Sequence, residues 1–334
     1  MNFLEKLNTS RKFLQAVVFK KRSPLSISWN ITYRCNLKCG YCGAWEKKVK
    51  ELSTKKVFAI IDEFINMGTK FIKFSGGEPL LREDLGQIID FCKRKKLYVL
   101  LNSNGTLVKK EQEKLKGVKE IQLSLDGPPQ INDAIRGRGV HDKVIEAVKI
   151  CKDRNISVIL STVISKYNIS HIPYILDIAK EYKIGVYFQP VDQNLSSNSP
   201  KDIKLLFAPE NSDYKKIIRY LIEEKKKNNK FISNSLAGLK HLYHWPVPRP
   251  VKCLMNLICC VIEPDGKMFV CDMFPNYRKY LVPMGKTFKD SFDKLSLPFP
   301  CQQCWNCLAA EFNLLASFKL EALGGLWRRA RNIL

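Results

Sequence analysis

The chain has 334 residues, of which 45% are hydrophobic, so it is long enough for one large barrel-type domain or two ordinary ones, and disorder is excluded for most of its length. Its 56 lysine and arginine residues against 32 acidic residues give a formal net charge of +24, which favours acidic partners such as phosphorylated metabolites, nucleic acid or an anionic membrane surface. No apolar run approaches the roughly 18 residues of a membrane span, and no cleavage signal follows the first one, so we expect a cytoplasmic protein.

Residues 1–24 combine apolar and basic side chains and predict an amphipathic helix. From residue 25 to residue 191, short β-rich runs alternate with amphipathic helical stretches, which is the pattern of repeated βα units around a parallel sheet. Strands are expected at residues 25–32, 70–75, 97–103, 120–125, 157–163 and 184–190. Because a closed barrel has about eight such units, the sequence predicts an α/β fold with a partial (β/α)6 barrel of the TIM type, open on one side.

Beyond the barrel the alternation stops, and residues 192–250 are expected to form a linker with a charged helix near residues 214–227. Residues 251–311 are rich in cysteine, and we expect a small separate domain there. Residues 312–334 predict a second basic amphipathic helix. Both terminal helices have the composition of helices that lie on an anionic membrane, but packing on the rest of the protein is the simpler interpretation and the one favoured by the sequence.

Twelve cysteines are too many for incidental packing, and a reducing compartment argues against a disulfide framework. One group lies near the start of the chain and a larger group lies in the last quarter, so two separate cofactor sites are expected. Cys92 and Cys151 stand apart from both groups, among apolar neighbours in helical patterns. We interpret these two as buried, inert thiols.

Cys35, Cys39 and Cys42 follow the first expected strand with C-x3-C-x2-C spacing. Three thiolates on one short loop can hold three irons of a cubane cluster and leave the fourth iron without a protein ligand, which makes that iron the functional point. A zinc site that lacks its fourth ligand is the alternative. One βα unit later the second strand ends in FSGGEPLL, where two glycines let the backbone approach a ligand closely and Glu78 brings a carboxylate to the same rim.

Together, the cysteine loop and the GGEP strand end resemble the radical S-adenosylmethionine (radical SAM) superfamily, over about residues 25–191. In that family the open iron binds the amino and carboxylate groups of SAM, the GGEP segment contacts the amino group, and the aromatic residue before the third cysteine lies against the adenine. The resemblance therefore implies that Cys35, Cys39 and Cys42 bind a 4Fe–4S cluster, and that the SAM contacts include Tyr41, Gly76, Gly77, Glu78 and Pro79.

Polar residues at the ends of the later strands converge on the same face of a parallel barrel, whatever the family. Asn102 follows the third strand, Ser124 the fourth, and Arg136 lies on the loop beyond. In relatives, residues near Ser124 and Arg136 help to hold the ribose and the carboxylate of SAM, so the resemblance implies these roles here. Asn102 is included among the cofactor-binding residues, although it and Asp126 could instead cap or orient loops.

The mechanism that the resemblance implies is reductive. An electron from a partner such as flavodoxin or ferredoxin enters the cluster, SAM is cleaved to methionine and a 5′-deoxyadenosyl radical, and the radical removes a hydrogen from a small molecule, a lipid precursor or a peptide. One alternative is an RNA-modifying radical SAM enzyme, suggested by the net charge of +24, although we do not expect a nucleic-acid partner. The other is a non-catalytic iron–sulfur electron carrier, which conflicts with the open iron.

In the C-terminal region an EPDGK turn predicts a β-hairpin and places Cys271 on the returning strand. The spacing from Cys253 through Gly266 to Cys271 resembles the first half of the SPASM domain, an auxiliary iron–sulfur module, but no cysteine follows Cys307. Two fully ligated clusters would need more cysteines than this region has, so one auxiliary 4Fe–4S cluster is expected, as in the shortened module called twitch. The candidate ligands are Cys253, Cys259 and Cys271 with one of Cys301, Cys304 and Cys307. Zinc, or two clusters of which one has an open iron, are the alternatives.

Asp272, beside Cys271, matches an aspartate that acts as a base toward substrate in sulfatase-maturing relatives, so the resemblance implies a catalytic base here. Hydrogen bonding within the hairpin is the alternative for this carboxylate. His241 and His244 could meet on one helix face, but no further ligand pattern accompanies them. We interpret both histidines as solvated or packing side chains.

Overall fold

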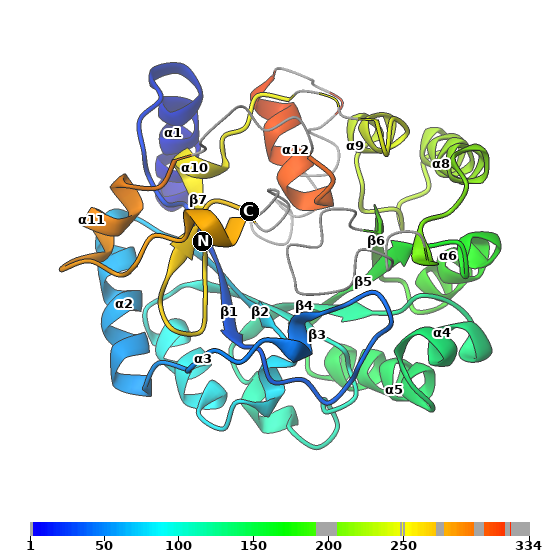
Figure 1. Ribbon diagram of the computed structural model, residues 1–334, viewed down its shortest axis with the longest axis horizontal. Helices are drawn as coiled ribbons and strands as arrows, with labels where there is room; N and C mark the ends of the chain where they lie inside the picture. The colour runs from blue at the N-terminus through cyan, green and yellow to red at the C-terminus, as the bar shows by residue number, and fades with distance from the viewer. Residues whose placement is uncertain are drawn as a thin grey trace.

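One curved sheet of eight strands forms the centre of the computed structural model, which describes residues 3–191, 206–247, 249, 251–271, 277–296, 304–317 and 321 (Figure 1). The strand order is β6-β5-β4-β3-β2-β1-β7-β8. The six strands from β6 to β1 are parallel neighbours, and their bounds are β1 (Ser26–Thr32), β2 (Phe71–Gly76), β3 (Tyr98–Ser103), β4 (Val118–Ser124), β5 (Ser157–Ile164) and β6 (Gly185–Pro190). Every expected strand is present within two residues of its predicted ends, so the partial-barrel prediction is confirmed.

Helices cover the convex side of the first six strands (Figure 1). They are α2 (Thr54–Met67), α3 (Leu85–Arg94), α4 (Pro129–Arg136), α5 (Val140–Asp153) and α6 (Ile172–Glu181). Successive side chains of a strand point to opposite faces of a sheet. In β1 the fully buried Trp29 contacts Phe64 of α2, with 6.2 Å between ring centroids, while its neighbours Ser28 and Asn30 are only partly buried. The concave face therefore carries polar side chains that are not sealed by the core.

Helix α2 illustrates how the sequence sets these elements. Its buried residues are Val57, Ile60, Ile61 and Phe64, whose spacing of three and four residues makes one apolar face. Ser53 is the N-cap by backbone conformation, but its side chain makes no capping hydrogen bond. Gly68 ends the helix in the left-handed conformation, with φ of 96°, which glycine adopts without steric cost.

The cysteine-rich region is joined to the barrel by the sheet itself. Strand β7 (Cys259–Ile262) pairs in parallel with β1, and β8 (Met268–Phe269) returns antiparallel to β7, so the predicted hairpin is present. Cys271 lies two residues beyond the end of β8, which corrects its predicted place on the strand. The returning strand is short, and its two residues pair with Val261 and Ile262 of β7.

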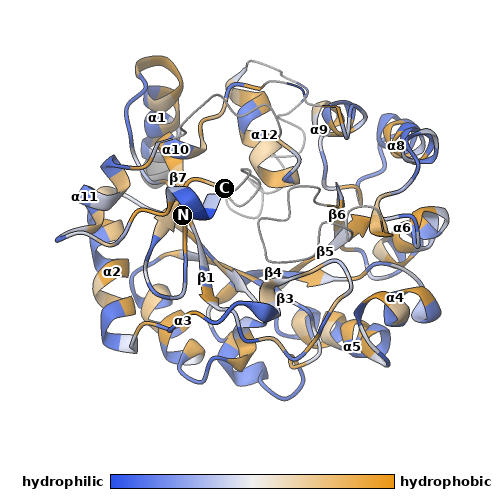
Figure 2. Cartoon of the chain, in the orientation of Figure 1, coloured by the Kyte–Doolittle hydropathy of each residue, from blue (hydrophilic) through white to orange (hydrophobic). Residues whose placement is uncertain are grey.

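The remaining helices lie beyond the two ends of the sheet, which are β6 on one side and β7 with β8 on the other (Figure 1). They are α8 (Asn211–Lys226), α9 (Leu236–Leu242), α10 (Met255–Ile258), α11 (Phe288–Asp293) and α12 (Cys307–Ala316). The predicted charged helix is α8, and it begins three residues earlier than expected. Hydrophobic residues dominate α12, which packs beside α9 (Figure 2).

The predicted N-terminal helix is α1 (Phe3–Phe19). It buries Ala16 and Val17, and the ring of Phe13 lies 6.5 Å from that of Phe312 in α12. Of the predicted helix at residues 312–334, the first part belongs to α12, and most of the rest lies outside the described residues. In the part of the chain that the structure describes, no helix is both long and apolar enough to cross a membrane.

The two isolated cysteines and His241 are buried in the structure, as expected for packing side chains. Cys92 and Cys151 are fully buried, and burial raises the pKa of each thiol to about 12, which fits inert core cysteines. His241 is buried, and burial lowers its pKa to about 4, so it packs as a neutral ring. His244 is exposed, in line with the solvated alternative.

Candidate functional site

The loop after β1 brings Cys35, Cys39 and Cys42 to the carboxyl ends of the parallel strands, where barrel folds place their active sites. All three thiols are partly exposed, and no cysteine in the described ranges forms a disulfide. Among those residues, no group of three or more His, Cys, Asp or Glu side chains is arranged to hold a single metal ion. The thiolates of a cubane cluster bind different irons and therefore stand farther apart than the ligands of one ion.

The start of the loop is fixed by the end of β3. Asn104 places its Nδ2 atom 3.9 Å from the Sγ atom of Cys35 and donates a hydrogen bond of 2.9 Å to Asn36 Oδ1. Asn36 in turn donates to the hydroxyl of Thr106 at 2.8 Å. The backbone N–H of Leu37 points to Cys35 Sγ at 3.5 Å. Asn104 lies in LNSNG after the third expected strand, and the sequence placed it at that strand end without predicting this role for it.

Two glycines at the end of β2 fit against the backbone that leads into the cysteine loop. A Cβ atom on Gly77 would lie 2.3 Å from the carbonyl oxygen of Arg34, and one on Gly76 would lie 2.0 Å from that of Thr32. The N–H of Gly77 donates to Thr32 at 2.8 Å, and the N–H of Glu78 donates to Arg34 at the same distance. The two glycines therefore allow the end of β2 to lie close to the backbone that follows β1.

The carboxylate of Glu78 lies between the carboxyl ends of β2 and β3 and is bound there by the protein itself. It is fully buried and accepts hydrogen bonds from Asn104 N at 2.7 Å, Ser103 Oγ at 3.0 Å and Leu80 N at 3.1 Å. Burial nevertheless raises its pKa to about 7. Pro79, the next residue, is buried at the start of the short 3-10 helix η2 (Pro79–Leu81). Glu78 thus joins the end of β2 to the end of β3.

Asn102 has a buried acceptor at the end of β3. Its Nδ2 atom lies 3.4 Å from the hydroxyl of Ser75 on the neighbouring strand, but among the described residues its Oδ1 atom has no hydrogen-bond partner. A buried acceptor without a donor is costly, so this oxygen fits a ligand that carries an N–H or O–H group. Ser124, at the end of β4, is partly buried and in register with Ser161 of β5.

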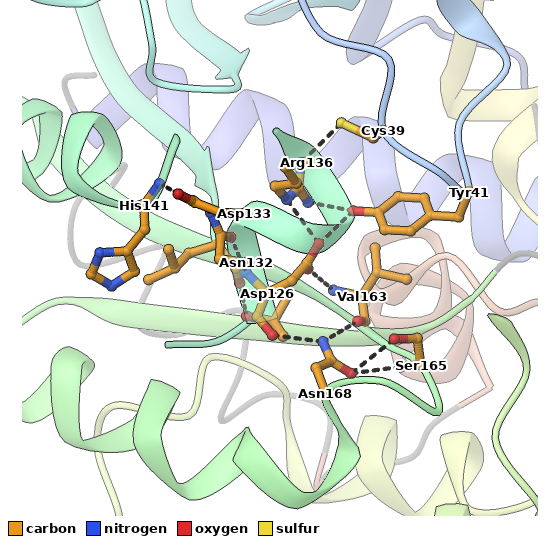
Figure 3. A network of polar contacts seen from close by, with 12 residues as sticks. Cys39, Tyr41, Asp126, Asn132, Asp133, Arg136, His141, Val163, Ser165 and Asn168 are labelled. Carbon is orange, nitrogen blue, oxygen red and sulfur yellow. Dashed lines mark hydrogen bonds and ion pairs between the residues drawn. The ribbon is translucent and has the colours of Figure 1, made fainter. Parts of the chain in front are cut away.

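Arg136, Asp126 and Tyr41 form a buried polar network beside the loop (Figure 3). Arg136 Nε lies 2.8 Å from Asp126 Oδ2, and the Tyr41 hydroxyl donates to the same oxygen at 2.7 Å. Arg136 Nη2 also contacts the Tyr41 hydroxyl, and Nη1 lies 4.0 Å from Cys39 Sγ. Burial alone would lower the pKa of Arg136, but the charge of Asp126 outweighs it and raises that pKa, so the guanidinium stays charged.

This donor set fits the cluster and SAM that the sequence resemblance implies. Burial raises the pKa of Cys35 to about 11 and also raises that of Cys39, so iron coordination is what would keep these thiols ionised. Three thiols, a nearby cation and an unpartnered acceptor lie around one set of strand ends. The residues present can therefore hold a cluster and a polar cofactor there.

The C-terminal cysteines are spread along several elements. Cys253 precedes α10, Cys259 begins β7, and Cys271 follows β8, all three partly buried. Cys304 is buried, accepts a hydrogen bond from Asn313 Nδ2 at 3.3 Å, and its carbonyl oxygen lies 3.0 Å from His241 Nε2. Cys301 and Asp272 lie outside the described residues.

Cys307 connects the C-terminal region to the barrel. It begins α12, and its Sγ atom lies 3.7 Å from Oε1 of Gln189 on β6. Gln189 is the last residue but one of β6 (Gly185–Pro190) and lies at the carboxyl end of that strand. Cys307 therefore lies at the carboxyl end of β6, the edge at which the cysteine loop follows β1, whereas Cys259 pairs with Ser26 at the amino end of β1.

The comparisons with known proteins agree with these observations. The family model described as the radical SAM superfamily matches residues 29–179. An AdoMet-dependent heme synthase of Methanosarcina barkeri is 31% identical over 281 residues, which cover 76% of this chain and 78% of the relative. An Fe-coproporphyrin III synthase of the same organism is 38% identical over 173 residues, but these cover 50% of this chain and only 43% of that relative.

The fold is also that of solved structures. Streptococcus suis SuiB bound to S-adenosylmethionine superimposes with a TM-score of 0.62 at 19% identity, covering 80% of this chain and 65% of SuiB. At this identity the likeness describes the fold, including the strand ends at which the cysteine loop lies.

Proposed function

Because the chain belongs to the radical SAM superfamily, whose cofactors are a 4Fe–4S cluster and SAM, we propose that it is an enzyme that reductively cleaves SAM and abstracts hydrogen from a substrate. Bound to Cys35, Cys39 and Cys42, the cluster would supply the electron that breaks a carbon–sulfur bond of SAM and so generates a 5′-deoxyadenosyl radical. The observation that carries the proposal is the cysteine loop itself, which Asn104 holds at the end of β3, the strand that also carries Asn102.

Each residue around the loop has a definite task in this proposal. Gly76, Gly77 and Pro79 shape the end of β2 so that backbone groups border the cofactor. Asn102 accepts a hydrogen bond from SAM, and Ser124 contacts its ribose. The ring of Tyr41, set edge-on to Phe207 at 5.8 Å between centroids, lies against the adenine and helps to exclude water. The proposed role of Glu78 is indirect: its carboxylate accepts hydrogen bonds from three groups of the protein and joins the ends of β2 and β3.

We assign a second, auxiliary 4Fe–4S cluster to the C-terminal cysteines. Cys253, Cys259 and Cys271 supply three ligands, and one of Cys301, Cys304 and Cys307 supplies the fourth. The contact between Cys307 and Gln189 supports a position at the open end of the barrel. The hydrogen bond from Asn313 is of the kind that tunes a cluster thiolate if Cys304 is the ligand. Asp272 acts as a base toward the substrate in this scheme.

The proposed substrate is an anionic small molecule, and an iron tetrapyrrole is the first to test. The net charge of +24 favours a substrate that carries carboxylates. The names of the two Methanosarcina barkeri relatives refer to heme and to Fe-coproporphyrin III. A peptide is the alternative substrate, and a flavodoxin or ferredoxin is the proposed electron donor. Binding of tRNA that falls steeply with salt would instead favour an RNA-modifying enzyme.

The experiment is an anaerobic incubation of reconstituted protein with SAM, dithionite and either Fe-coproporphyrin III or no substrate. The proposal predicts methionine and 5′-deoxyadenosine in equal amounts, with faster release when the substrate is present. The matched control is the Cys92→Ala variant, which alters a buried thiol far from the loop and keeps the reaction. Absence of 5′-deoxyadenosine from cluster-loaded protein would contradict the proposal.

We further propose peripheral contact between α1 and the inner face of an anionic membrane. Leu7, Leu14 and Val18 are 52%, 57% and 59% exposed, and their spacing puts them on one side of the helix with the exposed Arg11. Ala16 is buried on the opposite side, so the exposed apolar side chains are not needed for packing. Figure 2 shows hydrophobic and hydrophilic residues mixed along α1. Such a helix matches a surface of acidic lipids.

Sedimentation with phosphatidylglycerol vesicles tests this contact. Full-length protein is expected to bind, and high salt is expected to weaken binding without abolishing it, because salt screens only the charged part. Replacing Leu7, Leu14 and Val18 together by Ser should release the protein. Leu206→Ser, at an exposed apolar residue elsewhere, should not. Equal binding by the triple variant, or no binding by the wild type at low salt, would refute membrane contact.

A further inference from the structure

Asp126 lies at the centre of the network that holds the cysteine loop, although it does not touch a cysteine (Figure 3). We propose that Asp126 is a positioning residue that orders the middle of this loop, through Arg136 and Tyr41, before any cluster binds. The inference rests on the proposed function only in taking Cys39 as a cluster ligand. The claim that the network orders the loop concerns the protein without cofactors.

Asp126 is fixed on every side by the protein. Its carboxylate is fully buried, and Oδ1 accepts a hydrogen bond from the N–H of Val163 at 3.0 Å. Its own N–H donates to Asn132 Oδ1 at 3.0 Å, and its carbonyl oxygen accepts from Asn168 Nδ2 at 2.8 Å. β4, α4 and β5 therefore set the position of the carboxylate.

The remaining oxygen of Asp126 is shared by Arg136 and Tyr41. Arg136 Nε approaches it at 2.8 Å and the Tyr41 hydroxyl at 2.7 Å, while Arg136 also contacts that hydroxyl directly. A buried carboxylate and guanidinium that separated would each be left without a partner in a medium of low polarity. The three side chains therefore stay together. Because Tyr41 belongs to the cysteine loop, its hydrogen bonds to Asp126 and Arg136 fix the position of the loop.

The middle of the loop is held to α4 at two more points. The N–H of Gly40 donates to the carbonyl oxygen of Ile135 at 3.1 Å, and Nη1 of Arg136 lies 4.0 Å from Cys39 Sγ. The start of the loop has separate anchors on the end of β3, through Asn104. The network thus determines where Cys39 lies, and it places a cation beside the thiolate that iron would bind.

A direct role for Arg136 on the SAM carboxylate leads to different expectations. The structure uses Arg136 Nε, Nη1 and Nη2 toward three groups of the protein. If Arg136 acted only on SAM, removal of the Tyr41 hydroxyl would leave the loop of the cofactor-free protein unchanged. If the network orders the loop, the same removal loosens it.

Hydrogen exchange of the full-length, cofactor-free protein separates these cases. Tyr41→Phe keeps the ring beside Phe207 but removes the shared hydroxyl, and we expect amides of residues 39–42 to exchange about tenfold faster, which corresponds to an opening easier by about 1.4 kcal/mol. Asp126→Asn should have the same effect or a larger one. The matched control is Tyr174→Phe, which removes a hydroxyl 2.9 Å from His141 and should leave residues 39–42 unchanged.

A second measurement tests the charge beside Cys39 in reconstituted protein. Arg136→Gln should make the loop cluster about tenfold harder to reduce, which lowers its reduction potential by about 59 mV for one electron. Arg136→Lys keeps a positive charge and should restore most of the wild-type potential. Unchanged exchange in both Tyr41→Phe and Asp126→Asn would overturn the positioning role, whether or not the protein cleaves SAM. Equal potentials in wild type and Arg136→Gln would overturn the role of the charge.

Discussion

Ser26, the first residue of β1, is paired in register with Cys259, the first residue of β7. The strand that leads into the cysteine loop and the strand that carries a C-terminal cysteine are therefore neighbours in one sheet. This pairing means that the cysteine-rich region completes the barrel edge at β1 and is not merely attached to it. It also fixes the separation between the two proposed cluster sites through backbone hydrogen bonds.

Breaking β7 is expected to disturb both regions. Val261→Pro removes an N–H from a strand that is paired on both sides, with Ser28 on one side and Phe269 on the other. We expect a loss of about 1–3 kcal/mol in unfolding free energy, because the partner in the ladder is left without its hydrogen bond. Urea denaturation measures this loss, and lower total iron is expected after reconstitution. Val261→Thr keeps the N–H and the branched side chain and serves as the control. Unchanged stability in the proline variant would mean that β7 is not a stable part of the sheet.

Gly77 should not tolerate a side chain. A Cβ atom there would meet backbone oxygens of Arg34 and Tyr33 at 2.3 and 2.6 Å, which cannot rotate away as a side chain could. Gly77→Ala should therefore lower the unfolding free energy by about 1–3 kcal/mol and reduce iron bound at the loop. At Gly86 in α3 the nearest atom is a side-chain carbon at 3.4 Å, so Gly86→Ala should instead gain about 0.5–1 kcal/mol. Thermal unfolding of both variants tests the contrast, and equal melting temperatures would argue against it.

Asn102→Ala should weaken SAM binding with little effect on stability. Its Oδ1 atom has no donor among the residues that the structure describes, so removing it costs the folded chain little, whereas a hydrogen bond to SAM would be lost. We expect the dissociation constant of SAM to rise about two- to tenfold, since a hydrogen bond contributes about 0.5–1.5 kcal/mol. Calorimetric titration of reconstituted protein provides the measurement, with Asn211→Ala on exposed α8 as the control. A large loss of stability without a change in affinity would assign Asn102 a structural role.

The stability of the cofactor-free protein should depend on pH through Glu78. Burial raises the pKa of Glu78 to about 7 from an ordinary value of 4.5, so between these values the folded chain holds a proton that the unfolded chain has lost. The resulting stabilisation is present below about pH 4.5 and is lost as the pH rises to about 7, a change of about 3 kcal/mol. Glu78→Gln should remove this part of the pH dependence. Parallel curves for wild type and variant, from urea unfolding across pH 4.5–7.5, would contradict the assignment.

Local patterns in the sequence were sufficient for the six βα units but not for the two strands that extend the sheet beyond β1. The strands from residue 25 to residue 190 and the apolar face of α2 follow from alternation and helical spacing, which depend on neighbouring residues. The parallel pairing of β7 with β1 joins residues far apart in the chain. No local period encodes such a pairing, and therefore a separate C-terminal domain was expected.

The site was predicted in its residue types and less well in its contacts. The spacing of Cys35, Cys39 and Cys42 identified the loop, because ligands on a short segment must be close in space. Glu78 was expected at the rim, and the sequence did not predict that Ser103 and Asn104 at the end of β3 would bind its carboxylate. The choice of partner depends on how neighbouring strand ends pack, and only the three-dimensional structure contains that information.

The most direct test of the account is SAM cleavage by a variant in which Cys35, Cys39 and Cys42 are all replaced by Ala. Wild-type protein and the Cys92→Ala control, reconstituted anaerobically and reduced with dithionite, should release 5′-deoxyadenosine. The triple variant should release none, while it keeps about four irons per chain at the C-terminal cysteines. Release of 5′-deoxyadenosine by the triple variant would show that the loop is not the site of the chemistry, and the central claim would be wrong.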